Sequence, residues 1–85
     1  MKKTIAEETR EYFCEIKRNV RKGEKVMPWL SGTKNKRTMM YKEASRYEQD
    51  ANIDYELGVI SKEEYEIEIK AVQLLEQALA NYSVY

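Results

Sequence analysis

The chain has 85 residues, 42% of them hydrophobic, and its 15 Lys and Arg balance its 15 Asp and Glu. That length allows one domain with a small core, so we expect support from self-association or from a larger partner. The sequence has no His and one Cys, which excludes imidazole catalysis, His-ligated metals, internal disulfides and cysteine zinc clusters. A single thiol and the lack of a long apolar run lead us to expect a cytoplasmic protein without a membrane segment.

The net charge of zero conceals a strong asymmetry along the chain. Residues 1–46 carry 13 Lys or Arg against 6 Asp or Glu, a net +7, whereas residues 47–85 carry 2 against 9, a net −7. One interpretation is internal complementarity, with a basic helix against an acidic one or two copies packed head to tail. The other is a basic surface for nucleic acid, or an acidic surface that imitates it.

The first predicted helix covers about residues 4–22. Its apolar residues recur at helical spacing from Tyr12 through Ile16 to Val20. Thr4 and Glu7 have the spacing of a capping box, and Gly23 is a typical helix stop. We expect Cys14 to fill space in the core as a small apolar side chain, since no His is present to activate it.

Residues 23–37 are predicted to form a loop, because Pro28 disfavours helix before it and Gly32 favours a turn. A connection of this length is unusual in a small domain and is often functional. It contains Met27, Trp29 and Leu30, which either cover the core as a lid or project as an anchor for a partner. We predict these three residues as a partner-binding site, since Trp is enriched among interface hot spots.

A second helix is predicted over about residues 38–57 and a third over about 61–81. The second has a narrow apolar face that includes Met40, Ala44 and Tyr47, and the third a broader one that includes Val72 and Leu75. The fold class is therefore all-α: a small three-helix protein with a long loop between helices 1 and 2 and a C-terminal αα-hairpin.

The stretch "DANIDYELGVISKEEYE", residues 50–66, has two interpretations. Asp50, Asn52 and Asp54 match the first ligand positions of an EF-hand, but the glycine and the final glutamate of that motif fall out of register. A helical hairpin explains the same residues: Gly58 ends one helix, and Ser61 caps the next. We predict the hairpin and no metal site.

The segment "YELGVISKEEYEIEIKAVQLL", residues 55–75, resembles the short C-terminal helical hairpin family called SHOCT. That family typically has a leucine, a glycine, Ile-Ser or Ile-Thr, and Glu-Glu-Phe, followed by a lysine and a leucine pair. Here Tyr65 replaces the phenylalanine, and the lysine and leucines are shifted along the chain. The resemblance covers about a quarter of the chain. It implies a non-catalytic interaction or oligomerisation hairpin in which the matching residues have structural roles: Gly58, Ile60, Ser61, Glu64 and Tyr65.

Basic side chains close the first helix and follow the loop. They are candidates for binding nucleic acid or an acidic partner: Lys17, Arg18, Arg21, Lys22, Lys34, Lys36 and Arg37. No helix-turn-helix glycine pattern or RNA-binding aromatic motif accompanies them.

We predict no enzymatic activity and no cofactor, because no nucleophile has a base and no glycine-rich phosphate loop occurs. Small size, seven tyrosines and polarised charge are typical of a phage-like inhibitor or regulator that occupies a macromolecule. The predicted function is a non-catalytic interaction protein that binds and regulates or inhibits a protein or ribonucleoprotein complex, with a homodimer as one arrangement. The alternative is a small nucleic-acid-binding regulator that uses the basic N-terminal half.

Overall fold

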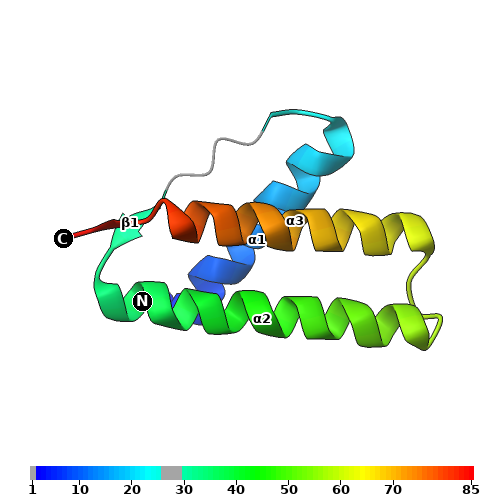
Figure 1. Cartoon of the computed structure of the whole chain (residues 1–85), viewed down its shortest axis with the longest axis horizontal. Helices are drawn as coiled ribbons and strands as arrows, with labels where there is room; N and C mark the ends of the chain where they lie inside the picture. Colours follow the sequence, from blue (N-terminus) through cyan, green and yellow to red (C-terminus); the bar gives the residue numbers. More distant parts are fainter. Residues whose placement is uncertain (1, 26–29) are drawn as a thin grey trace.

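The computed structural model describes residues 2–25 and 30–85, which form three helices and one short pair of strands. In chain order these are α1 (Ile5–Lys22), β1 (Ser31–Gly32), α2 (Lys34–Glu56), α3 (Lys62–Ala80) and β2 (Ser83–Val84). Figure 1 shows α2 and α3 side by side as a hairpin, with α1 crossing behind them. The prediction of a mainly helical fold with three helices is confirmed. Among the described helices, none is long and apolar enough to cross a membrane.

Local signals set both ends of α1. The Thr4 hydroxyl accepts a hydrogen bond from the backbone N–H of Glu7 at 3.1 Å, which satisfies one of the free donors of the first turn. At the other end Gly23 has a φ of 71°, and its N–H and that of the next residue bond to the carbonyls of Val20 and Asn19. This pairing is a Schellman motif, so the helix ends at the predicted glycine.

The turn between α2 and α3 uses the same chemistry. Gly58 has a φ of 73°, and the N–H groups of Gly58 and Val59 bond to the carbonyls of Tyr55 and Asp54 at 3.1 and 2.8 Å. Ser61 then caps α3. Asp54 therefore lies in the last turns of a continuous helix, and the acidic residues before Gly58 form no calcium loop.

Tyr65 joins the two helices beyond the turn. Its ring stacks on that of Tyr55 with centroids 4.4 Å apart, and its hydroxyl donates to Asn52 Oδ1 at 2.6 Å. Both of these partners belong to α2. Tyr65 thus sets how the hairpin closes.

Helix α2 begins at Lys34, four residues before the predicted start. Thr33 has an extended backbone and accepts a hydrogen bond from the N–H of Lys36 at 3.1 Å, so it caps the helix. The cap is hard to detect in the sequence because Lys36 stands where a capping box has Glu or Gln.

Strand β1 and strand β2 tie the long connection to the C-terminal segment. They are parallel, with Ser31 beside Ser83 and Gly32 beside Val84. The N–H of Ser83 donates to the carbonyl of Leu30 at 3.0 Å. Gly32 has a φ of 153°, and a Cβ atom there would overlap the hydroxyl of Tyr82.

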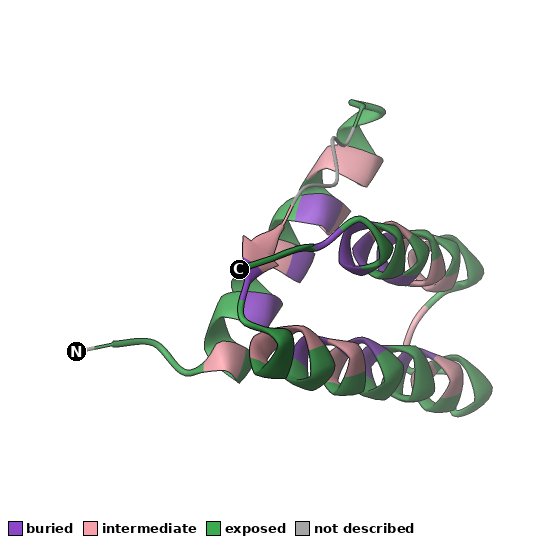
Figure 2. Ribbon diagram, turned by 60° about the vertical axis from the view of Figure 1, so that its left-hand side comes forward, coloured by how far each residue is buried: buried purple, intermediate pink, exposed green. Residues whose placement is uncertain are grey.

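The core lies where α1 crosses the hairpin. Figure 2 shows the buried positions on the sides of the helices that face one another. Phe13 of α1 stacks on Tyr47 of α2 with ring centroids 4.6 Å apart. The cluster is completed by residues from all three helices and by one tyrosine after α3: Ile16, Met40, Ala44, Ala71, Val72, Leu75, Leu79 and Tyr82.

Two positions of α1 differ from the expectation. Cys14 is exposed, so the prediction that it fills space in the core is wrong. It follows Phe13 directly, and one residue corresponds to about 100° around a helix, which turns the thiol away from the core. Thr9 occupies the core position instead: it is fully buried, and its hydroxyl donates to the carbonyl of Ile5 at 2.7 Å.

The close approach of Gly32 to Tyr82 yields a stability prediction. Gly32→Ala is expected to lower the free energy of unfolding by about 1–3 kcal/mol, since the new methyl group overlaps the Tyr82 hydroxyl and the backbone conformation is unfavourable. In a Tyr82→Phe background the cost should be smaller, because the overlapping oxygen is gone. Urea unfolding of the four proteins in this double-mutant cycle measures the difference, and equal costs in both backgrounds would contradict the overlap.

Candidate interaction surface

Two of the predicted basic residues are neutralised by α3. Lys17 Nζ lies 3.0 Å from Glu68 Oε1, and both side chains are about four-fifths buried, at 20% and 18% exposed. One turn further along α1, Arg21 forms an ion pair with Glu64. The basic second half of α1 therefore lies against the acidic first half of α3, as internal complementarity requires.

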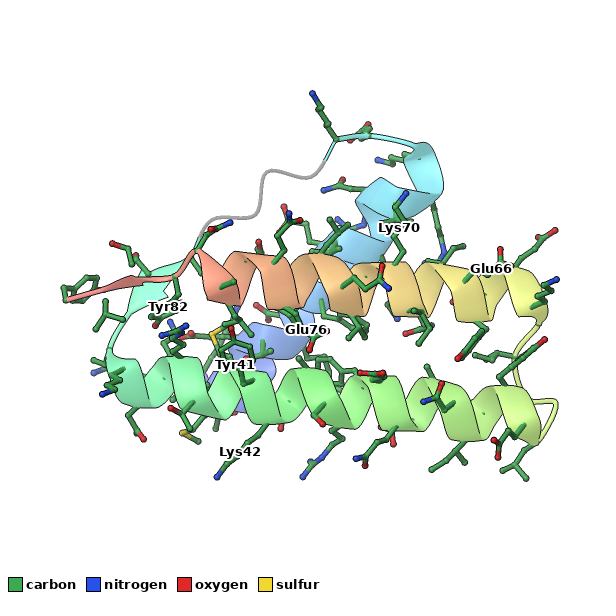
Figure 3. All side chains as sticks on the ribbon, viewed as in Figure 1. Tyr41, Lys42, Glu66, Lys70, Glu76 and Tyr82 are labelled. Atoms are coloured by element: carbon green, nitrogen blue, oxygen red, sulfur yellow. The ribbon has the colours of Figure 1, made fainter. Side chains whose placement is uncertain are left out.

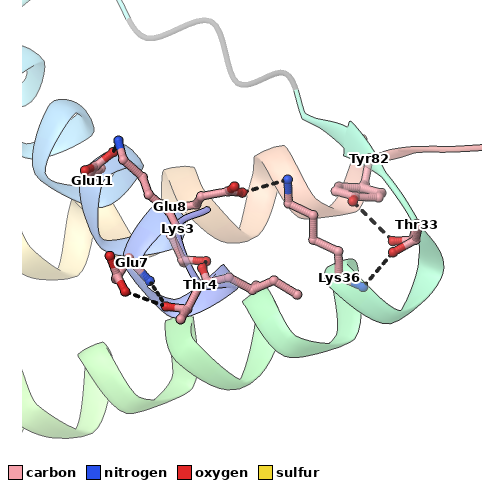
Figure 4. Close-up of polar contacts among 10 residues, drawn as sticks. Lys3, Thr4, Glu7, Glu8, Glu11, Thr33, Lys36 and Tyr82 are labelled. Atoms are coloured by element: carbon pink, nitrogen blue, oxygen red, sulfur yellow. Dashed lines mark hydrogen bonds and ion pairs between the residues drawn. The ribbon is translucent and has the colours of Figure 1, made fainter. Parts of the chain in front are cut away.

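Two more predicted basic residues are engaged at the start of α2. Lys36 Nζ lies 2.9 Å from Glu8 Oε2 of α1, and this hydrogen-bonded carboxylate raises the pKa of the Lys36 ammonium group (Figure 4). Arg37 donates from Nε to the carbonyl of Leu79 at 3.2 Å, and its guanidinium lies 5.6 Å from the ring centre of Tyr41. Arg37 thereby satisfies a carbonyl near the C-terminal end of α3.

The other three predicted basic residues are exposed, and none has an ion pair with another described residue. Arg18 and Lys22 lie on the second half of α1, and Lys34 is the first residue of α2. Figure 1 shows the end of α1 and the start of α2 well apart, joined by the long connection. The structure thus does not bring the seven predicted basic residues together into one free patch.

Of the predicted partner anchor, only Leu30 belongs to the described part of the chain; Met27 and Trp29 lie outside it. Leu30 is half-buried and packs against the core. It also lies in a groove of about 390 Å³ between α1 and the start of α2, whose other apolar lining residues are Tyr12 and Met40. Charged side chains complete the lining of this groove: Lys3, Glu8, Glu11, Glu15 and Lys36.

A smaller hollow of about 200 Å³ lies between α1 and the hairpin, beside the stacked rings of Phe13 and Tyr47. Cys14, Lys17 and Asp50 are among its lining residues. Both cations of the lining have other contacts: Lys17 is paired with Glu68, and the Arg10 guanidinium lies 5.6 Å from the centre of the Tyr47 ring. Within residues 2–25 and 30–85, no group of three or more acidic or Cys side chains is placed to hold a metal ion.

Apolar side chains at the closed end of the hairpin are exposed, and sequence reasoning assigned them no role. Leu57 is 73% exposed, Val59 67% and Ile53 52%, while Met39 is 42% exposed near the other end of α2. Exposed apolar side chains in a group often mark an interaction surface. The signal available in the sequence is that Ile53 and Leu57 are four residues apart, on a side of the helix away from the buried residues Met40, Ala44, Tyr47 and Ala51.

Comparisons with protein-family models, with curated proteins and with solved structures find no match for this chain. The resemblance of residues 55–75 to the SHOCT family therefore stays a prediction.

Tyr47 of α2 has a raised pKa because of its buried position. Its hydroxyl is buried and has no hydrogen-bond partner among the described residues. Burial, and after it the negative charge of Glu43, raises the pKa of Tyr47 to about 12 from 10.0. The folded state therefore holds the phenolic proton more tightly than the unfolded state does.

This shift predicts how stability depends on pH in the alkaline range. The contribution of the neutral phenol is fully present below pH 10.0 and is lost as the pH rises towards 12. The free energy of unfolding should fall there by up to about 1.4 kcal/mol per pH unit from this group alone. Urea unfolding across that range should show a weaker pH dependence for Tyr47→Phe than for the unchanged protein. Tyr85→Phe, at an exposed tyrosine, should not differ from the unchanged protein.

Proposed function

We propose that the protein is a non-catalytic interaction protein that binds and regulates or inhibits a protein partner. The groove between α1 and the start of α2 carries this proposal. Its volume of about 390 Å³ falls within the range of natural binding sites, and it combines an apolar lining with charged side chains of both signs. Such a composition suits a segment of another protein that inserts one or two apolar side chains.

The state of the basic residues favours a protein partner over nucleic acid. Lys17, Arg21 and Lys36 are paired with carboxylates of the same chain. A phosphate would have to compete with those carboxylates, and it would gain less from counterion release than at a free cationic surface. Nucleic-acid binding by the basic half would have to rely on side chains that lie apart from one another.

The charges around the groove indicate the chemistry of the segment that fits it. Lys3 pairs with Glu11 and Lys36 with Glu8, so these four charges are compensated. Glu15 has no ion pair with any described residue. An apolar segment with one Lys or Arg at its edge would therefore match the groove, with the cation beside Glu15.

The first experiment tests the groove directly. The tagged protein captures its partner from a cell lysate, and the affinity of the purified pair is measured for three variants. Glu15→Arg should weaken binding, because it reverses the uncompensated charge. Trp29→Ala, at the anchor predicted from the sequence, should cost about 2 kcal/mol of binding free energy if that residue is a hot spot. Glu76→Arg, an equal charge reversal at an exposed site on α3 outside the groove, should leave affinity unchanged.

A parallel titration with duplex DNA and RNA at low and high salt tests the competing function. Only weak binding is expected, without preference for either nucleic acid. Tight binding with a steep salt dependence, lost on reversing Arg18, Lys22 and Lys34 to Glu, would contradict the proposal. Equal loss of partner binding in Glu15→Arg and Glu76→Arg would also count against the groove.

A further inference from the structure

One side of α2 is turned away from α3, and of its residues only Asp50 also lines the hollow between α1 and the hairpin. Figure 3 shows Lys42 on this side, pointing away from α3 into solvent. The residues on it are separated by three or four positions, so they follow one line along the helix. We call this line the outer stripe; all its members are exposed, and in chain order they are Met39, Lys42, Arg46, Asp50, Ile53 and Leu57.

The outer stripe is apolar at both ends. Met39 is 42% exposed at one end, and Ile53 and Leu57 are 52% and 73% exposed at the other. Helix α2 already buries a separate line of apolar residues in the core, so the ends of the outer stripe are a second set of apolar positions on the same helix. A surface helix of a monomer is usually polar on the side away from the core, and a second apolar side indicates a second partner.

The centre of the outer stripe is charged, and the two signs are separated along the helix. Lys42 and Arg46 come first, and Asp50 follows one turn later. The Arg46 side chain is 69% exposed and reaches Glu43 of its own helix at only 3.8 Å, a weak contact that it can exchange. Asp50 has no ion pair with any described residue. From one end to the other, the outer stripe is apolar, basic, acidic and apolar.

We propose that the outer stripe binds the same stripe of a second copy, with the two α2 helices antiparallel about a two-fold axis. Reversing the stripe puts its basic part opposite the acidic part of its partner and its apolar ends opposite each other. In this register Arg46 of each copy faces Asp50 of the other, and Met39 faces Leu57. Each contact occurs twice, as two-fold symmetry requires. The aliphatic part of the Lys42 side chain of one copy covers Ile53 of the other.

The proposed contact has the dimensions of a helix pair. From Met39 to Leu57 the outer stripe is about 27 Å long, at about 1.5 Å per residue. Since members of the stripe recur at close to the period of a straight helix, the two helices can stay in contact along this length without strong supercoiling. The residues of α2 in the groove, Lys36 and Met40, face α1, so the dimer leaves the proposed partner site open.

Charge reversal tests the register as well as the contact. Sedimentation equilibrium of the full chain over a range of concentrations is expected to show a reversible dimer. Arg46→Glu puts two glutamates opposite two aspartates, and Asp50→Arg puts arginine opposite arginine. Each should raise the dissociation constant at least about tenfold, because like charges meet at two symmetric sites. The double variant Arg46→Glu/Asp50→Arg exchanges the signs and should restore the dimer.

Two further variants complete the test. Leu57→Asp should also weaken the dimer, since it removes an exposed apolar contact, and circular dichroism should show unchanged helix content. Glu76→Arg, outside the stripe, should dimerise like the unchanged protein. A chain that stays monomeric at every concentration would overturn the proposal, and so would a double variant no better than the single ones. Loss of partner binding with an intact dimer concerns the groove alone, so the two proposals fail separately.

Discussion

The packing of α1 across the α2–α3 hairpin is the contact on which the rest of the structure depends. The hairpin has small residues at its inner positions, such as Ala44 and Ala71, which bring its helices close but bury little apolar area by themselves. Phe13 and Ile16 of α1 add two large side chains to those of the hairpin and complete the core. Ion pairs on either side of this crossing, Lys17 with Glu68 and Lys36 with Glu8, then fix the position of α1 relative to both helices. The Lys17–Glu68 pair is partly buried and contributes more to the position of α1 than the more exposed Lys36–Glu8 pair, since exposed ion pairs contribute little free energy.

The charge asymmetry of the chain is resolved in two ways by this arrangement. Where α1 meets α3, basic residues of the first half of the sequence lie against acidic residues of the second, and both are neutralised internally. The boundary between the two halves, however, falls inside α2, between Arg46 and Asp50. The outer side of α2 therefore carries positive charges before the boundary and a negative charge after it. A partner surface matches it when its negative and positive charges follow the opposite order. The antiparallel copy of α2 has that order by construction, so the same asymmetry that holds the monomer together also makes a surface complementary to itself.

Local chemistry in the sequence predicts the helices well, whereas contacts between distant residues are not predicted. The ends of α1 and the turn at Gly58 follow from glycine, threonine and serine at capping positions, which act within four residues. Thr33 shows the limit of that reasoning, because its cap lacks the glutamate that makes a capping box visible. The hydrogen bond from the Ser83 N–H to the Leu30 carbonyl depends on the fold of the whole chain, and no local sequence pattern predicts it. The prediction for Cys14 is wrong because Phe13, and not Cys14, lies on the buried line of α1 that begins at Thr9.

The functional surfaces could be predicted only in part, for a physical reason. The sequence does not show whether a basic side chain is free or in an ion pair. Lys17 is paired with Glu68 and its neighbour Arg18 is exposed, because the two lie on different sides of α1. Exposed apolar residues are equally hard to recognise in the sequence, because Ile53 and Leu57 look like core residues until the true core line is known. A core of this size leaves little stability in reserve. A dimer through α2 would add to it by mass action, since only folded chains can form the interface. The same contact would shield Leu57 from water and give each assembly two grooves, so that a partner with two matching segments would be held more strongly than either groove could hold it alone.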